Sequence, residues 1–248
     1  MRTVAVANQK GGVGKTTTAV CLAGALAERG ERVLVVDADA QGNATRWLGA
    51  DSVGAELLEA WERGDVEELI MPTTIESVDL LPSSPMLAVA EKHFAAVLGA
   101  ELLLRDALRA LPKRWTWMLI DCPPTLGFVT TSALIAAKEI LIPMQTELMA
   151  LEGLRDLEAT VAAIRKRGMN RQLKVRGIVG VMHDRRTRLS GQVLDALHTR
   201  YGDQMLKTTI RKAVRLAEAP GAHQPITIYE PDGMAAKDVR DLAAELAA

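Results

Sequence analysis

The sequence predicts an α/β fold, a doubly wound and mostly parallel sheet flanked by helices. Short apolar, β-branched stretches alternate with stretches of helical periodicity along the chain. Parallel strands need long crossovers, usually helices, so this alternation favours a parallel sheet. With 48% apolar residues, the 248-residue chain can bury one large core, and no repeat, low-complexity tract or linker-like segment divides it. Residues 1–248 are therefore expected to form a single domain.

The expected elements follow in chain order. The first strand covers residues 3–7, and a helix over residues 16–29 follows it and ends at Gly30. Further strands are expected at residues 32–36, 78–81, 117–120, 139–143 and 175–182. Helical patterns separate them at residues 85–98, 101–110, 151–167, 189–201 and 234–247. In such a sheet, ligand sites lie outside the carboxyl ends of the strands.

The turn after the first strand is typical of a phosphate-binding loop. A glycine-rich turn between a strand and a helix points backbone N–H groups at an anion, and the helix N-terminus adds partial positive charge. Lys15 is expected to reach the β- and γ-phosphates, and the Thr16 hydroxyl to bind magnesium. The alternative, a glycine-rich turn with two solvated lysines, is disfavoured by the flanking strand and helix. The candidate nucleotide-binding residues are Lys10, Gly11, Gly12, Val13, Gly14, Lys15, Thr16 and Thr17.

Acidic residues follow two of the other expected strands. Asp37 and Asp39 end the second strand, beside the expected phosphate loop. Asp121 ends the apolar strand at residues 117–120, as in a Walker B strand, where it would hold magnesium through a coordinated water. Thr16, Asp39 and Asp121 are therefore candidate magnesium-binding residues. In the alternative interpretation, the paired aspartates cap a helix or form a turn.

Charge is distributed unevenly along a chain whose net charge is −1. Residues 165–215 hold 14 Lys and Arg against 3 Asp and Glu, a net +11, and the rest holds 16 against 28, a net −12. Such a basic region supplies sequence-independent attraction to nucleic-acid phosphates, with a solvated basic face as the alternative. The candidate DNA-binding residues are Arg185, Arg186, Arg188, Lys207, Arg211, Lys212 and Arg215.

Several other classes of protein are disfavoured. Cys21 and Cys122 lack metal-type spacing and are expected to be reduced thiols in the core, so no zinc or cluster site is indicated. No apolar run approaches the roughly 20 residues that span a bilayer. The N-terminus has no charged segment followed by a long apolar one. A soluble cytoplasmic protein is expected.

The loop K-G-G-V-G-K-T-T resembles the deviant Walker A motif of the ParA/MinD family of P-loop ATPases. Gln9 stands where the ordinary motif has its first glycine. The resemblance implies ATP and Mg²⁺ as cofactors, and a second lysine, Lys10, that crosses a dimer to the partner's nucleotide. Residues 37–45 resemble the family's D-x-D-P-Q-G-N segment, with Ala40 in place of the usual proline. This likeness implies that Asp39 positions the attacking water, so Lys10, Lys15 and Asp39 are the candidate catalytic residues.

The basic region also resembles a part of this family, the chromosomal partition ATPases. Arg186 and Arg215 match arginines that bind DNA there, whereas Ala213 replaces an asparagine that can meet adenine. The resemblance implies a nucleoid-associated ATPase that dimerises with ATP, binds double-stranded DNA non-specifically and is stimulated by a ParB-type centromere-binding protein.

Two alternatives stay open at this point. One is a MinD-like, membrane-associated positioning ATPase, which the acidic, small-residue pattern of residues 238–248 disfavours because a membrane helix needs basic and bulky apolar residues. The other is a nucleotide-gated DNA-binding scaffold with negligible turnover.

Overall fold

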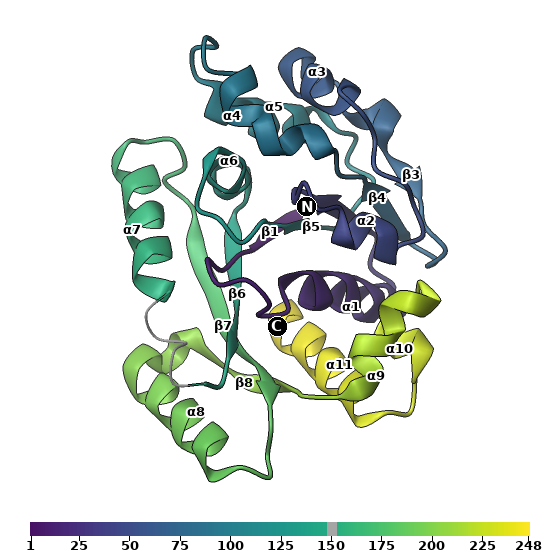
Figure 1. Ribbon diagram of the computed structural model, residues 1–248, viewed down its shortest axis with the longest axis vertical. Coiled ribbons are helices and arrows are strands. Elements are labelled where there is room, and N and C mark those ends of the chain that lie inside the picture. Colours follow the sequence, from purple (N-terminus) through teal and green to yellow (C-terminus); the bar gives the residue numbers. More distant parts are fainter. Residues whose placement is uncertain (148–152) are drawn as a thin grey trace.

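In the computed structural model, which describes residues 1–147 and 153–248, one sheet has the strand order β3-β4-β2-β5-β1-β6-β7-β8 (Figure 1). Neighbouring strands are parallel except for β3, which is antiparallel to β4. The predicted doubly wound, mostly parallel sheet is confirmed. The strands are β1 (Arg2–Val6), β2 (Val33–Asp37), β3 (Met71–Pro72), β4 (Val78–Leu81), β5 (Trp117–Asp121), β6 (Glu139–Gln145), β7 (Lys174–His183) and β8 (Met205–Arg211).

Helices cover both faces of this sheet (Figure 1). The α-helices are α1 (Lys15–Glu28), α2 (Asn43–Trp47), α3 (Glu56–Arg63), α4 (Ala90–His93), α5 (Leu103–Ala110), α6 (Phe128–Ala136), α7 (Gly153–Lys166), α8 (Arg188–Tyr201), α9 (Val214–Glu218), α10 (Ile226–Tyr229) and α11 (Met234–Ala247). Short 3₁₀ helices are η1 (Glu67–Leu69), η2 (Pro85–Val89), η3 (Ala100–Leu102), η5 (Gly202–Gln204) and η6 (Ala219–Ala222). Within the described residues, no helix is both long and apolar enough to cross a membrane.

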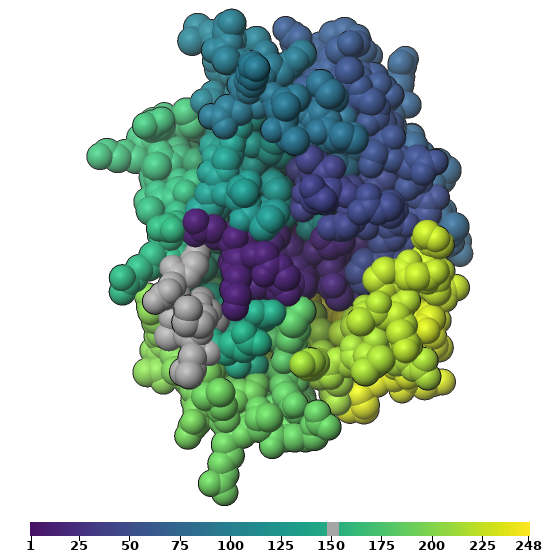
Figure 2. Space-filling view, viewed as in Figure 1, coloured from purple at the N-terminus to yellow at the C-terminus, as the bar shows by residue number. Residues whose placement is uncertain are grey.

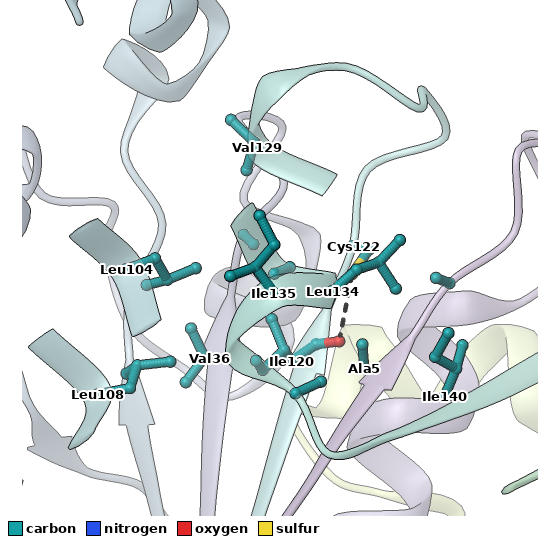
Figure 3. Packing of buried hydrophobic residues seen from close by; sticks show 14 of the residues in the cluster. Ala5, Val36, Leu104, Leu108, Ile120, Cys122, Val129, Leu134, Ile135 and Ile140 are labelled. Carbon is teal, nitrogen blue, oxygen red and sulfur yellow. Dashed lines mark hydrogen bonds between the residues drawn. The ribbon is translucent and has the colours of Figure 1, made fainter. Parts of the chain in front are cut away.

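The central strands are buried on both faces, which explains their continuous apolar runs. Every residue of β2 and of β5 is buried. On one face, α5 and α6 pack against the sheet, as Leu104 and Ile135 against Val36 and Ile120 illustrate (Figure 3). On the other face, α1 and α11 contribute to a second apolar cluster. The rigid sheet thus holds the carboxyl ends of β1, β2 and β5 in fixed register.

The two cysteines are buried free thiols, as predicted. The Cys122 thiol donates a weak hydrogen bond to the Ile120 carbonyl at 3.7 Å (Figure 3). Burial raises the pKa of Cys21 to about 12, so this thiol stays protonated.

Some predicted elements are wrong or were missed. The predicted helix over residues 85–98 is instead η2 followed by the single turn of α4, because the apolar stripe ends at the buried Phe94 and Leu98 is fully exposed. The sequence did not predict α6, whose Val and Thr residues suit a strand, or β8, an edge strand that mixes charged and apolar residues. Residues 151 and 152 of the predicted helix over residues 151–167 lie outside the described residues.

Gly24 of α1 allows the chain before α10 to pack closely against this helix. A Cβ atom on Gly24 would lie 2.7 Å from Pro225 Cγ. Alanine normally stabilises an open helix by about 0.5–1 kcal/mol relative to glycine, but overpacking costs about 1–3 kcal/mol. We expect Gly24→Ala to lower the free energy of unfolding in urea by about 1–2 kcal/mol.

Gly191 of α8 provides the control, because a Cβ atom there would meet nothing within 4 Å. Gly191→Ala is expected to raise the free energy of unfolding by up to about 1 kcal/mol. A stabilised Gly24→Ala variant would contradict the close packing of α1 against Pro225.

Candidate functional site

The phosphate loop connects β1 to α1 at the carboxyl edge of the sheet. Gly12 and Gly14 have φ angles of 73° and 74°, in the left-handed region that glycine adopts without strain. Lys15 opens α1, and its ammonium Nζ donates a hydrogen bond to the Lys10 carbonyl at 3.1 Å. Burial lowers the pKa of Lys15, while the Asp121 carboxylate acts in the opposite direction. The loop is thus preformed, and the Lys15 ammonium is held over the turn that would receive the phosphates.

Asp121 ends β5 directly beside this loop. Its Oδ2 accepts a hydrogen bond of 2.7 Å from the Thr16 hydroxyl. Its Oδ1 is buried and has no hydrogen-bond partner within the described residues. Burial first, and the Asp37 carboxylate second, raise the pKa of Asp121 well above its usual range. An unpartnered buried carboxylate oxygen next to a hydroxyl is the setting that a hard cation would complete.

The two aspartates after β2 serve different purposes. Both oxygens of Asp37 accept hydrogen bonds from within the chain, from the Asp39 N–H at 3.2 Å and from the Thr45 N–H and hydroxyl at 2.7 Å each. Asp37 therefore ties β2 to α2, so the alternative interpretation of a capping aspartate holds for this residue. Burial raises the pKa of Asp37 to about 6.

Asp39 instead faces a cleft. Its Oδ1 accepts a hydrogen bond from the Gln41 N–H at 3.0 Å, and its carbonyl accepts one from the Ser83 hydroxyl at 2.5 Å. Gly42 closes this turn with a φ of 62°, and a Cβ atom there would lie 2.7 Å from the Ser52 hydroxyl oxygen. The backbone around Asp39 is held on both sides although Ala40 lacks the ring constraint of proline.

A cleft of about 660 Å³ runs over the phosphate loop. Its size is suited to a nucleotide. Sequence patterns did not indicate the part of the wall that α2 and η6 supply, where His223 Nδ1 donates a hydrogen bond of 2.8 Å to the Arg46 carbonyl. The lining residues include Gly11, Gly12, Gly14, Lys15, Thr16, Thr17, Asp39, Gln41, Asn43, Arg46, Pro124, Pro220 and His223.

A second cavity of about 460 Å³ adjoins this cleft, and Gly14, Thr17 and Met182 line both. Its wall is mainly apolar and includes Ala213, Val214 and Leu216. Its size and apolar lining suit a planar base whose phosphates lie on the loop.

The residues present fit a magnesium ion that shares its coordination with a nucleotide. The carboxylates of Asp37 and Asp39 both raise the pKa of Asp121, and the Lys15 ammonium acts in the opposite direction. Among the residues that the structure describes, no cluster of three or more carboxylate, His or Cys side chains is arranged to hold an ion unaided. Mg²⁺ commonly uses one or two protein ligands plus phosphate oxygens and water, which Thr16 and Asp121 can complement.

Lys10 is placed differently from Lys15. Its backbone N–H donates to Asn8 Oδ1 at 3.0 Å, and its ammonium pairs with Glu147 Oε2 at 3.6 Å. The side chain is 37% exposed. The second lysine of the loop is therefore held at the surface by an exposed partner, a pairing that costs little to exchange.

The predicted DNA-binding residues come together because β7 and β8 are parallel neighbours whose carboxyl ends meet. Arg185 and Arg186 follow β7, Arg188 begins α8, Arg211 ends β8, Lys212 follows it, and Arg215 lies on α9. Lys207 lies on β8 itself and shares with Arg185 a surface hollow of about 440 Å³. In Figure 2, the purple N-terminal segment lies in the middle of the face shown, above the light-green region at the bottom and beside the yellow-green region at the right.

The arginines differ in how free their side chains are. Arg211 donates two hydrogen bonds to the Asp238 carboxylate, at 2.6 and 2.8 Å, and is only 22% exposed, so it ties β8 to α11. Arg186 is 88% exposed and pairs with Asp184 at 3.0 Å, and Arg215 pairs with Glu218 at 2.8 Å. Arg186 is thus more accessible to a ligand than Arg211.

A parallel sheet, a glycine-rich loop before α1 and aspartates after β2 and β5 together define a P-loop nucleoside triphosphatase. A family model described as an AAA domain matches residues 1–175. The sporulation initiation inhibitor protein Soj of Bacillus subtilis is 42% identical over 248 residues, which cover 99% of this chain and 98% of that protein. The chromosome-partitioning ATPase Soj of Thermus thermophilus is also 42% identical, with 100% of this chain and 96% of that protein covered.

Solved structures agree with this class. Cobyrinic acid a,c-diamide synthase from Mycobacterium smegmatis, with bound ATP analogue and magnesium, has a TM-score of 0.84 and 34% identity over 98% of this chain and 93% of that one. The chain belongs to the Soj/ParA family of chromosome-partitioning P-loop ATPases. The family predicted from residues 10–17, the ATPase class, and ATP and Mg²⁺ as cofactors are thereby confirmed.

The raised pKa of Asp37 predicts a pH dependence of stability. Between the unperturbed aspartate pKa of about 3.9 and the folded value of about 6, the folded state binds more protons than the unfolded state. The contribution of Asp37 to the free energy of unfolding therefore falls as pH rises from about 4 to 6. Asp37→Asn removes this titration. The free energy of unfolding of the variant is therefore expected to come closer to that of the wild type as pH rises from about 4 to 6, as measured by urea unfolding.

Asp51→Asn is the control, because Asp51 is an exposed residue of the same type. Its difference from the wild type is expected to stay constant between pH 4 and 6. A deficit of Asp37→Asn that does not change with pH would show that burial does not shift this carboxyl group.

Proposed function

We propose that this chain acts, as a single domain, as an ATP-dependent DNA-partitioning ATPase associated with the nucleoid in the cytoplasm. Its ATP-bound sandwich dimer binds double-stranded DNA non-specifically, and a ParB-type centromere-binding protein stimulates hydrolysis and release. The observation that carries the proposal is that one cavity wall holds both Gly14 and Thr17 of the phosphate loop and Arg186 and Lys212 of the basic region. A nucleotide bound there lies next to the surface proposed for DNA.

The phosphate loop supplies the nucleotide contacts. Its backbone N–H groups and the N-terminus of α1 receive the phosphates, and Lys15 leaves the Lys10 carbonyl to reach the β- and γ-phosphates. Thr16 and Asp121 hold the magnesium ion, Asp121 through a coordinated water. Bound Mg²⁺ neutralises charge on the phosphate oxygens. The apolar second cavity takes the base, where Ala213 offers no amide to read it.

Asp39 orients the attacking water. Its carboxylate lines the cleft on the side of the phosphate loop, and the turn around it is fixed by Ser83 and Gly42. Phosphoryl transfer depends mainly on positioning and on cations near the transferring group, with little covalent work by the protein. A well-held Asp39 and a second lysine meet these two needs.

Lys10 supplies its charge to the other subunit. Its exposed ammonium exchanges Glu147 for the phosphates of the partner's nucleotide when two chains close around ATP. A charge supplied in trans lowers the barrier to phosphoryl transfer by roughly 4–7 kcal/mol in comparable arginine-finger systems. Dimerisation therefore gates hydrolysis.

The basic region binds the DNA backbone. Arg185, Arg186 and Arg188 are exposed at one end of β7, and Arg215 and Lys212 lie beside them after β8. Charges of this kind neutralise phosphates and release counterions, so affinity falls with salt and carries no sequence preference. Arg211 supports the surface from within through Asp238.

The packing of α11 argues against the membrane-associated alternative. Its apolar residues Val239, Leu242 and Leu246 are buried against the domain, and its Asp238 and Glu245 bind β8. A helix that lies on a lipid surface needs a free apolar face, which α11 uses inside the protein.

Binding to non-specific duplex DNA tests the proposal. We expect binding with ATP but not with ADP, weakened between 50 and 200 mM salt by roughly 10³-fold for about six phosphate contacts. Arg186→Glu is expected to weaken DNA binding without changing ATP affinity. Arg63→Glu makes the same charge change on α3 and is expected to change neither DNA binding nor ATP affinity. ATP-dependent sedimentation with anionic liposomes and no DNA binding would favour the membrane-associated alternative.

Lys10→Ala tests whether this lysine acts between subunits. Because the Lys10 charge serves the partner's nucleotide, the variant is expected to stay monomeric with ATP and to lose ATP turnover. Sedimentation velocity measures the first and an ATPase assay the second. The exposed Lys92 of α4 provides Lys92→Ala as a control with wild-type behaviour. Rapid ATP turnover by monomeric Lys10→Ala would refute the role in trans. ATP turnover by the wild type that never responds to DNA and the partner protein would favour the scaffold alternative.

A further inference from the structure

Three consecutive residues at the end of β6, Gln145, Thr146 and Glu147, contact the phosphate loop and the basic region at once; we call them the connector. Gln145 Nε2 donates a hydrogen bond to the Gly12 carbonyl at 3.2 Å. Glu147 Oε2 pairs with the Lys10 ammonium at 3.6 Å. The first and third residues of the connector thus lie against the loop that receives the nucleotide.

The middle residue of the connector contacts α8. The Thr146 hydroxyl shares a hydrogen bond of 2.5 Å with the Ser190 hydroxyl, and the two side chains belong to residues only 4% and 6% exposed. Ser190 lies in the first turn of α8, the helix that Thr187 caps through the Ser190 N–H at 3.4 Å. The contact between the connector and α8 is therefore a buried polar one, and such contacts have strict geometry.

Ser190 in turn organises the segment that carries the exposed arginines. Its hydroxyl also shares a hydrogen bond of 2.9 Å with His183 Nδ1 and accepts one of 3.3 Å from the Asp184 N–H. Asp184 then holds the Arg186 guanidinium through both carboxylate oxygens, at 3.0 and 3.1 Å. Hydrogen bonds to Ser190 and to the backbone and side chain of Asp184 thus link Thr146 to Arg186.

We propose that Thr146 and Ser190 are positioning residues that couple the nucleotide state of the phosphate loop to the placement of the DNA-binding arginine Arg186. The inference rests on the proposed function. When Lys10 leaves Glu147 for the partner's nucleotide, the connector loses one of its two contacts with the loop and shifts against Ser190. Coupling of this kind is reciprocal, so DNA raises nucleotide affinity by the same factor, typically about 5- to 150-fold.

Thr146→Val tests the coupling in the full chain, because valine keeps the shape of threonine and removes the hydroxyl. The readout is the ratio of DNA dissociation constants with ADP and with a non-hydrolysable ATP analogue. We expect this ratio to fall at least fivefold in Thr146→Val and in Ser190→Ala, with nucleotide affinity in the absence of DNA unchanged. Thr146→Ser keeps the hydroxyl and is expected to keep the wild-type ratio.

Thr199→Val is the matched control on α8, because among the described residues the Thr199 hydroxyl bonds only the Asp195 carbonyl of its own helix. It is expected to behave as the wild type. A merely structural role for Thr146 would lower DNA affinity equally with both nucleotides and leave the ratio unchanged, which would overturn the inference.

Hydrogen exchange of the amides at residues 183–190 separates this inference from the proposed function. The ATP analogue is expected to change their exchange in the wild type and not in Thr146→Val, whether or not DNA binds. A wild type that responds in exchange but never binds DNA would refute the proposed function alone. Equal responses in the wild type and in Thr146→Val, or none in either, would refute the coupling.

Discussion

Burial of several carboxylates at one edge of the sheet is the constraint on which the rest of this structure depends. The pairing of β2 with β5 sets Asp37 opposite Asp121, and Asp39 adds a third negative charge. Lys15 offsets only part of this charge, and its own ammonium is buried. A cation that arrives with phosphates would lower the electrostatic repulsion among these buried carboxylates, so nucleotide and metal binding would stabilise the folded chain.

The surroundings of these carboxylates show how the fold tolerates their repulsion. Asp37 is held by three hydrogen bonds from the chain, whereas Asp121 keeps one oxygen without a partner among the described residues. The carboxylate of Asp37 is thus satisfied by the fold, whereas that of Asp121 is not, although the two have the same chemistry. The difference arises from α2, which offers N–H and hydroxyl donors to the first and not to the second.

Much of the site could be predicted from the sequence because its parts are local. The spacing of Gly12, Gly14 and Lys15 after an apolar strand is a local pattern, and Asp39 and Asp121 lie at or just after the ends of buried strands. What the sequence could not indicate depends on contacts between distant segments. The meeting of Arg46 with His223, and the pairing of Arg211 with Asp238, leave no periodic signal in either segment.

The same reason explains the errors in the predicted fold. The sequence did not predict α6, whose Val and Thr residues prefer strands, because tertiary packing overrides this weak preference. In β8, the charged residues Lys207 and Arg211 indicated a basic surface, and they concealed the strand that carries them.

The contact between α11 and β8 has a consequence for self-association. β8 is an edge strand, and Glu245 accepts hydrogen bonds from the Lys207 and Thr208 N–H groups at 2.8 and 2.9 Å, in the place of a neighbouring strand. The opposite edge, β3, is only two residues long and contains Pro72. Both borders of the sheet thus resist the addition of a foreign strand. Many copies of this protein can crowd on one surface without their sheets merging into aggregates.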